Sequence, residues 1–193
     1  MGKTIILTGG GTAGHVTPNM GLIPRRLEDG WPIHYIGSFQ GIEKELIAQF
    51  PQVTYHGISS GKLRRYPDLM NLSDPFKVIA GAFQARRLVG QIKPRVIFSK
   101  GGFVSVPVVW AGHSRRVPVV VHESDITPGL ANRLAIPLCQ RVCTTFPEAA
   151  RAVGEKGVCT GSPIRPSLYA GSRARGLDFT GLPGKLPVLL IMG

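Results

Sequence analysis

Short apolar runs alternate with longer amphipathic stretches along most of the chain. The apolar runs are rich in β-branched residues and are bounded by Gly, Pro or polar residues, which is typical of buried strands. They lie at 3–8, 33–37, 53–58, 95–99, 117–121, 141–145 and 157–160. Helical periodicity predicts helices between them at 18–29, 41–49, 72–92, 104–114, 128–137 and 146–153. This alternation indicates an α/β fold with a Rossmann-like parallel sheet and helices on both faces.

The loops that connect four of these strands to the next helix contain glycine or ionisable residues. They span 9–15, 99–104, 122–128 and 161–165. In an open parallel sheet, ligands bind at the carboxyl ends of the strands. We therefore expect the four loops to converge on one site.

The end of the chain follows another pattern. Residues 170–185 are polar and rich in Gly, which predicts a connecting segment, and "LPVLLIMG" at 186–193 predicts a buried parallel strand. This strand either pairs with the main sheet or begins a second domain. We favour the second interpretation, with an N-terminal domain at 1–165 and, at 166–193, a linker and the first strand of a truncated C-terminal domain.

The first loop, "TGGGTAGHVTP" at 8–18, has the G-x-G-x-x-G spacing of a dinucleotide-binding turn. Such a site also needs an acid at the end of the second strand, where Gly37 and Ser38 stand instead. A P-loop needs Lys and Ser or Thr where His15 and Val16 stand. The loop is therefore expected to bind an anion at a helix N-terminus. His15 either acts there as a general base or merely caps the helix.

The other loops carry further candidate residues. In "SKGGFVSVP" at 99–107, Gly101 and Gly102 allow close backbone approach to a ligand, although a tight turn without a ligand fits as well. In "HESDITPGLANR" at 122–133, a carboxylate could orient His122 or bind sugar hydroxyls, or the loop could simply cap the next helix. In "TGSPIRP" at 160–166, Arg165 suits a phosphate but also fits a solvated linker.

The predicted helix at 72–92 has two apolar stripes. Val78, Ala82, Ala85, Val89 and Ile92 form one stripe, and Leu72, Phe76, Ile79 and Phe83 form the other, flanked by Arg86 and Arg87. One stripe can pack on the sheet. The second is either buried as well or exposed to an anionic lipid surface. The neighbouring cations favour the membrane.

Charge and composition narrow the partners. The chain has 23 Lys and Arg against 11 Asp and Glu, a net charge of +12, which favours an anionic partner. No nucleic-acid recognition motif accompanies the basic residues, so we expect no nucleic acid. The three cysteines form no C-x-x-C pair, and we expect no metal and no cofactor. No apolar stretch approaches the ~20 residues of a membrane span, so membrane contact would be peripheral.

Taken together and in order, "GGGTAGHVTPNM", "SKGGFVSVPVVWAG", "HESDITPGLANR" and "TGSPIRP" resemble the bacterial MurG family. The resemblance covers essentially the whole chain. It implies a GT-B glycosyltransferase with two Rossmann-like domains, of which this chain is the N-terminal, acceptor-binding half, inactive without the donor-binding C-terminal domain. The implied reaction is inverting transfer of GlcNAc from UDP-GlcNAc to undecaprenyl-diphospho-MurNAc-pentapeptide (lipid I), giving lipid II. The implied location is the cytoplasmic face of the bacterial cell membrane.

The resemblance also implies roles for individual residues. The implied catalytic residues are His15, His122 and Glu123, and the implied substrate-binding residues are Thr12, Ala13, Gly14, Gly101, Gly102, Ser105, Asp125, Asn132 and Arg165. His15 would be the base on the acceptor hydroxyl, and Arg165 would reach the donor. Ala13 stands where a Gly is common in the family, and Asp125 where many members carry Asn.

Three other functions are weighed against this one. The chain could be a non-catalytic, acceptor-binding subunit that needs a separate donor-binding chain. A nucleic-acid-binding protein is less favoured, because the basic residues are not interleaved with aromatic ones. A nicotinamide oxidoreductase is disfavoured by the missing ribose-binding acid.

Overall fold

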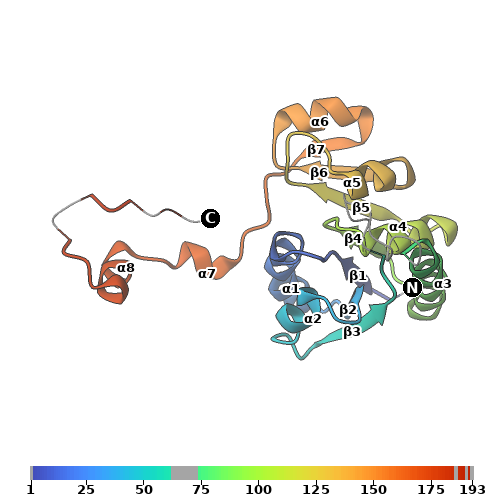
Figure 1. The fold of residues 1–193 in the computed structure, drawn as a ribbon, viewed down its shortest axis with the longest axis horizontal. Coiled ribbons are helices and arrows are strands. Elements are labelled where there is room, and N and C mark those ends of the chain that lie inside the picture. The colour runs from blue at the N-terminus through green and yellow to red at the C-terminus, as the bar shows by residue number, and fades with distance from the viewer. Residues whose placement is uncertain (1, 62–73, 185–186, 190, 192–193) are drawn as a thin grey trace.

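The computed structural model describes residues 2–61, 74–184, 187–189 and 191. Seven parallel strands form one sheet in the order β3-β2-β1-β4-β5-β6-β7 (Figure 1). The strands are β1 (Ile5–Thr8), β2 (Ile33–Ser38), β3 (Val53–Ile58), β4 (Val96–Ser99), β5 (Val119–Glu123), β6 (Arg141–Thr144) and β7 (Gly157–Cys159). Each overlaps a predicted strand, so the predicted parallel α/β sheet is confirmed.

Helices cover both faces of this sheet. The α-helices associated with it are α1 (Thr17–Glu28), α2 (Ile42–Ile47), α3 (Asp74–Ile92), α4 (Ser105–Ser114), α5 (Leu130–Ala135) and α6 (Pro147–Val153). Short 3-10 turns are η1 (Ala13–His15), η3 (Ile136–Leu138) and η4 (Gly154–Lys156). Each predicted helix is present, with ends that differ by a few residues from the prediction.

Alternate side chains along the strands build two separate cores. On one face, Ile6 and Ile97 belong to a cluster that includes α3 and α4 residues such as Val89 and Val108. On the other face, Leu7 belongs to a cluster that includes α1 and α2 residues. Because successive strand residues point to opposite faces, neighbouring apolar residues serve both cores. The two cores fix the ends of the strands, and the predicted site loops begin at those ends.

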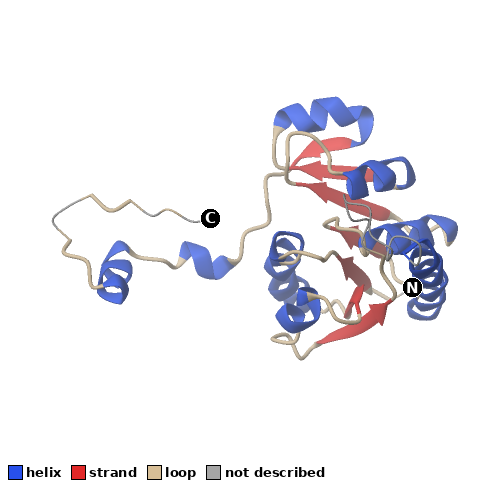
Figure 2. Cartoon of the chain, in the orientation of Figure 1, coloured by secondary structure: helices blue, strands red, loops and turns tan. Residues whose placement is uncertain are grey.

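The chain beyond β7 leaves the sheet and forms two further helices (Figure 2). They are α7 (Pro166–Tyr169) and α8 (Arg173–Thr180). Helix α8 lies within the connecting segment expected at 170–185, where no helix was predicted. Ser172 caps α8 by accepting a hydrogen bond from the Arg175 amide, and Gly181 ends the helix in the left-handed conformation. These two local signals outweigh the polar, Gly-rich composition of the segment.

The predicted buried strand at 186–193 is also not found in the described part of that segment. Residues 187–189 and 191 belong to no strand. Leu189 is 84% exposed and Ile191 is 83% exposed. A strand needs a hydrogen-bonded neighbour, and none of the seven sheet strands pairs with this segment.

The two-stripe pattern of the predicted helix at 72–92 appears in α3. Ala85 and Val89 are buried against the sheet, whereas Phe76 is 75% exposed and Phe83 is 68% exposed. Ile79 is exposed with them, and Leu72 lies outside the described residues. The alternative prediction that both stripes are buried is therefore wrong for the described residues. Within the described residues, no helix combines the length and apolar character that a membrane span requires.

Candidate functional site

Three of the predicted loops converge on one pocket at the carboxyl ends of β1, β4 and β5. The pocket has a volume of about 210 Å³. It is lined by Thr12, Gly14, His15, Lys100, Gly102, Glu123, Ser124, Asp125, Gly129, Ala131 and Asn132. The expectation that strand-to-helix loops meet at one edge is confirmed for these three loops. The fourth, at 161–165, contributes nothing to this pocket.

The side chain of His15 lies at the mouth of the β1–α1 loop, in the turn η1. Its Nδ1 atom lies 2.9 Å from the Thr12 hydroxyl oxygen, a hydrogen bond that fixes the orientation of the ring. Burial lowers the pKa of His15, and the nearby Lys100 lowers it further, while Glu123 and Asp125 act in the opposite direction. The net effect favours the neutral imidazole, and in the tautomer whose Nδ1–H donates to the Thr12 hydroxyl, Nε2 is the free proton acceptor.

The two glycine loops that frame the pocket pack directly against each other. A Cβ atom on Gly102 would lie 2.2 Å from the carbonyl oxygen of Gly10, and the backbone of Gly102 has a φ of +83°. A Cβ atom on Gly9 would lie 2.4 Å from the carbonyl oxygen of His15. Glycine is thus required at both positions by space, and at Gly102 also by conformation.

Glu123 organises the loop that follows β5. Its Oε1 accepts a hydrogen bond from the Asp125 amide, and its Oε2 accepts hydrogen bonds from the Gly129 amide and the Asn132 side-chain amide. The side chain is 4% exposed, and three donors share its two oxygens. This geometry gives Glu123 a structural task in shaping the pocket wall.

His122 faces away from this pocket. Its Nε2 lies 2.9 Å from the Gly161 carbonyl oxygen, so the expectation that a carboxylate orients this ring is wrong. The ring lines a second pocket of about 310 Å³, together with Leu22, Phe98, Cys143, Thr160, Gly161, Ser162 and Pro163. The structure therefore does not bring His122 together with His15. The reason is strand alternation, because adjacent residues of β5 point to opposite faces.

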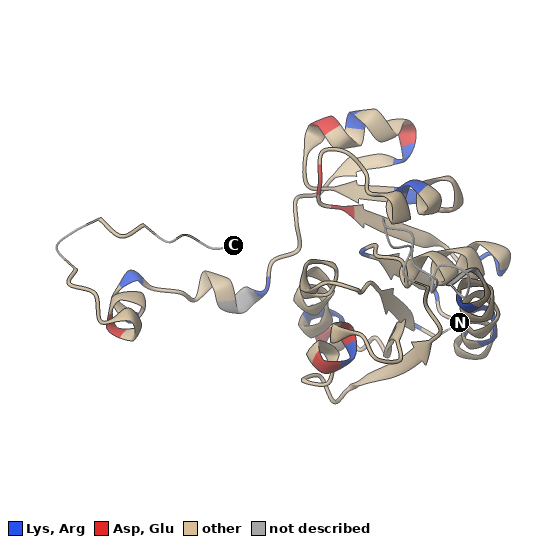
Figure 3. Cartoon of the chain, viewed as in Figure 1, with Lys and Arg blue, Asp and Glu red and all other residues tan. Residues whose placement is uncertain are grey.

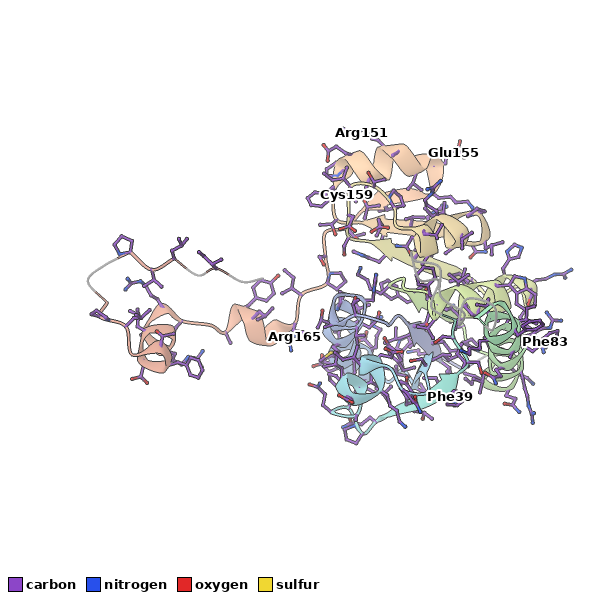
Figure 4. All side chains as sticks on the ribbon, in the orientation of Figure 1. Phe39, Phe83, Arg151, Glu155, Cys159 and Arg165 are labelled. Carbon is purple, nitrogen blue, oxygen red and sulfur yellow. The ribbon has the colours of Figure 1, made fainter. Side chains whose placement is uncertain are left out.

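Four other predicted residues do not line the first pocket. Gly101 packs against the Asn132 side chain. Ser105 is buried, and its hydroxyl donates to the Gly102 carbonyl oxygen, which fixes the start of α4. Ala13 is exposed in η1. Arg165 lies on the segment that leaves the sheet, just before α7 (Figure 4).

Lys100 is a pocket residue that the sequence analysis missed. It stands directly before the glycine pair that was singled out, and its side chain is 3% exposed. Burial lowers the pKa of Lys100, although Glu123 and Asp125 act in the opposite direction. A Lys at the end of a buried strand was the available signal, because strand ends in such a sheet meet the ligand.

Glu43 is the second missed residue. From the first turn of α2 it accepts hydrogen bonds from the amide and hydroxyl of Ser38 and from the amide of Gly11. Burial alone would raise the pKa of Glu43, but these hydrogen bonds outweigh it and the pKa is lowered. The carboxylate thus occupies the end of β2 and holds the glycine loop. An acid is present at this end after all, yet it is 1% exposed and already bonded to protein.

A metal site was not expected from the sequence. Across the described ranges, no three His, Cys, Asp or Glu side chains gather closely enough to hold a metal ion.

The family of the chain follows from comparison with known proteins. Residues 5–144 match the model of the glycosyltransferase family 28 N-terminal domain. Among solved structures, the crystal structure of Acinetobacter baumannii MurG superimposes with a TM-score of 0.70 at 24% identity, covering 84% of this chain and 46% of that one. The UDP-GlcNAc 2-epimerase of Neisseria meningitidis, bound to UDP-GlcNAc, superimposes with a TM-score of 0.62 at 10% identity, over 92% of this chain and 50% of that one. At these identities the likeness shows the fold, which is that of the N-terminal half of a GT-B glycosyltransferase.

Curated relatives are more similar in sequence. A protein of Lachnoclostridium phytofermentans is 57% identical over 192 residues, covering 99% of this chain and 54% of the relative. A protein of Clostridium botulinum strain Langeland is 55% identical over the same shares. Both are called UDP-N-acetylglucosamine--N-acetylmuramyl-(pentapeptide) pyrophosphoryl-undecaprenol N-acetylglucosamine transferase. The chain spans about half the length of the curated relatives it matches. The chain belongs to glycosyltransferase family 28 and carries the N-terminal domain of that family.

Proposed function

We propose that this chain provides the acceptor-binding half of an enzyme that transfers GlcNAc from UDP-GlcNAc to lipid I. The observation that carries the proposal is the position of His15, a histidine held neutral in a pocket between two closely packed glycine loops. The names of the curated relatives supply the donor sugar and the class of acceptor. No residue of the pocket suggests a cofactor, and none is proposed.

His15 acts as the general base in this proposal. It accepts the proton of a muramyl hydroxyl, and the hydroxyl oxygen then forms a bond to the anomeric carbon of UDP-GlcNAc. The bond from that carbon to the UDP oxygen breaks, UDP leaves with the electron pair, and the configuration at the carbon is inverted. Backbone amides at helix N-termini, including those beside Gly14 and Gly102, stabilise the negative charge of diphosphate oxygens.

The lengths of the relatives suggest how acceptor binding and donor binding are shared between two halves of the enzyme. They extend over about twice the length that this chain matches, and we propose that transfer needs the part that lies beyond the match. Residues 1–165 then form the acceptor domain, and 166–193 lead toward the donor-binding part. Arg165, at the exit from the sheet, is proposed to reach the donor diphosphate, because a guanidinium suits phosphate oxygens.

Helix α3 is proposed as the surface that docks on the membrane. Phe76, Ile79 and Phe83 are exposed on one side of it, and Figure 4 shows Phe83 on the side away from the sheet. Arg87 is exposed beside them, while Arg86 is tied to α4 by a hydrogen bond to Ser114. Figure 3 shows Lys and Arg on α3, and Arg115 and Arg116 follow directly after the end of α4. An apolar patch with nearby cations suits an anionic lipid surface, here the cytoplasmic face of the bacterial membrane.

The test is transfer of labelled GlcNAc from UDP-GlcNAc to a lipid I analogue. This chain would be measured alone and as a joined chain, fused to the second half of the Lachnoclostridium phytofermentans relative. We expect turnover by the joined chain only. Turnover by the short chain alone would place the donor site within these 193 residues. Binding of the analogue without turnover in either form would support a non-catalytic, acceptor-binding subunit instead.

A further inference from the structure

Lys100 is a nearly buried cation whose charge is only partly balanced by the neighbouring carboxylates Glu123 and Asp125. Its side chain is 3% exposed and lines the pocket of about 210 Å³. No hydrogen bond or ion pair of its ammonium group is found among the described residues, although its backbone amide donates to the Thr8 carbonyl oxygen. Burying a lysine costs free energy unless its charge is compensated. An ammonium group held in this way inside a ligand pocket is suited to an anion.

We propose that Lys100 is the phosphate-binding cation of this pocket. The ligand group is a phosphate of a sugar diphosphate, and this choice of ligand rests on the proposed function. The backbone bond to Thr8 fixes Lys100 at the end of β4, level with the glycine loop after β1. Gly9 leaves the room for it, because a Cβ atom there would lie 3.2 Å from the Lys100 Cβ.

The same cation has a second effect on the site. His15, Lys100, Glu123 and Asp125 all line one pocket. Lys100 lowers the pKa of His15, whereas the two carboxylates act in the opposite direction. The positive charge of Lys100 also contributes to the lowered pKa of His122, which lies on the other face of the sheet. When a phosphate neutralises Lys100, the basicity of His15 rises, so phosphate binding strengthens the proposed base.

Calorimetric titration with inorganic pyrophosphate tests the proposal in this chain. Lys100→Met removes the charge and keeps an unbranched side chain, and Lys3→Met removes the charge of an exposed Lys as the matched control. We expect Lys100→Met to weaken pyrophosphate affinity by about tenfold or more, the worth of a charged hydrogen bond, and Lys3→Met to leave it unchanged. Lys100→Arg, which keeps the charge, should retain most of the affinity. Unchanged affinity in Lys100→Met overturns the proposal.

Histidine NMR titrations provide a readout that a merely structural Lys would not move. In Lys100→Met the titration midpoint of His15 should shift to higher pH, while those of His34 and His56, on the far strands, should stay in place. A His15 midpoint that does not move overturns the effect of Lys100 on the base, whereas unchanged pyrophosphate affinity overturns the phosphate-binding role itself. If Lys100→Met fails to fold, as judged by circular dichroism, both measurements are made on Lys100→Gln, which has a side chain of similar length without the charge.

Two further calorimetric titrations identify the molecule that supplies the phosphate. UDP represents the donor, and a short polyprenyl diphosphate represents the acceptor. The titrant whose affinity falls in Lys100→Met is the diphosphate that Lys100 binds. If the affinity for neither titrant falls, the proposal is overturned. The transfer assay separates this inference from the proposed function. If the joined chain fails to transfer GlcNAc while Lys100→Met still loses diphosphate affinity, the proposed reaction is wrong and the phosphate-binding role of Lys100 stands.

Discussion

At the scale of single residues, the base role proposed for His15 ties the working pH range of the site to the protonation of this ring. The pKa of His15 is lowered from its ordinary value, chiefly by burial and then by Lys100. The unprotonated ring therefore predominates above a pKa that lies below ~6.5. A general base with these properties is active at neutral pH and is lost only in more acidic solution.

His15→Ala should lower kcat/KM for GlcNAc transfer by the joined chain by about 10²- to 10⁴-fold, the usual contribution of a positioned base. In the unaltered sequence, kcat/KM should fall as the pH drops through the lowered pKa of His15. That acidic limb should vanish in His15→Ala. The exposed His113, changed to Ala, is the control and should leave both the rate and the pH profile intact. A rate unaffected by His15→Ala would exclude it as the base.

Glu43 shows how one buried carboxylate can hold two loops. It accepts three hydrogen bonds from Ser38 and Gly11 and is 1% exposed. Glu43→Gln replaces one accepting oxygen with a donor that faces other donors. We expect the free energy of unfolding at pH 7 to fall by about 2 kcal/mol, within the range for an unsatisfied buried group. Urea unfolding measures this, and Glu45→Gln, at an exposed position of the same helix, should cost little.

At the scale of elements, the contact between the two glycine loops joins β1 and β4 at the pocket. Gly102→Ala would place a Cβ atom 2.2 Å from the Gly10 carbonyl oxygen, on a backbone with φ of +83°. We expect a loss of about 2 kcal/mol or more in the free energy of unfolding, from strain and from displacement of the loop. Gly129→Ala is the matched control, because it also lines the pocket but has open space and an ordinary φ of −64°. Equal stability of the two variants would contradict this account.

Helix α3 allows substitutions of its exposed stripe to be compared with substitutions of its buried stripe. Phe83→Ser removes an exposed aromatic group, and Val89→Ser alters the buried stripe of the same helix. We expect Phe83→Ser to weaken flotation with phosphatidylglycerol vesicles while the melting temperature stays nearly unchanged. Val89→Ser should lower the melting temperature, because it buries a hydroxyl in the core. Vesicle binding that survives both Phe83→Ser and Phe76→Ser would remove α3 as the docking surface.

The elements themselves were largely predictable, but the contacts between them were not. Apolar runs located every strand, because the strands of a parallel sheet form short runs rich in Val, Ile and Leu. Helix α8 was missed, since its formation depends on a single capping Ser172 and a terminal Gly181. The roles of Glu43 and Lys100 emerge only when distant segments meet. Predicting the face of the sheet to which His122 points would have required the exact register of β5. A shift of one residue would have placed the side chain on the opposite face.

At the scale of the whole molecule, histidines distributed over several elements couple the fold to pH. His34 and His56, on β2 and β3, stack with ring centroids 5.2 Å apart and share a hydrogen bond of 2.9 Å. One ring donates and the other accepts, so protonation of both would set two donors against each other. Burial lowers the pKa of both rings, and His34 lowers that of His56 further.

The sign of the resulting pH dependence can be worked out. His15, His34, His56 and His122 all have a lowered pKa, with burial as the main cause. In the unfolded chain these histidines titrate near ~6.5. Between that value and the lower folded values, the unfolded state binds more protons than the folded state. Stability is therefore fully present above about pH 6.5 and decreases as the solution is acidified below it.

We expect the free energy of unfolding to drop by about 1 kcal/mol or more between pH 7.5 and pH 5.5, a figure that allows for solvent screening of the partly exposed rings. Urea unfolding at the two pH values measures the drop. The double variant His34→Gln and His56→Gln should show a smaller difference between the two pH values, even if it is less stable at both, because it lacks two of the groups that take up protons. His113→Gln, at an exposed position, should retain the full difference. A stability that is level or rises on acidification would mean that the folded chain accommodates these protons, and would contradict the lowered pKa of these histidines as a group.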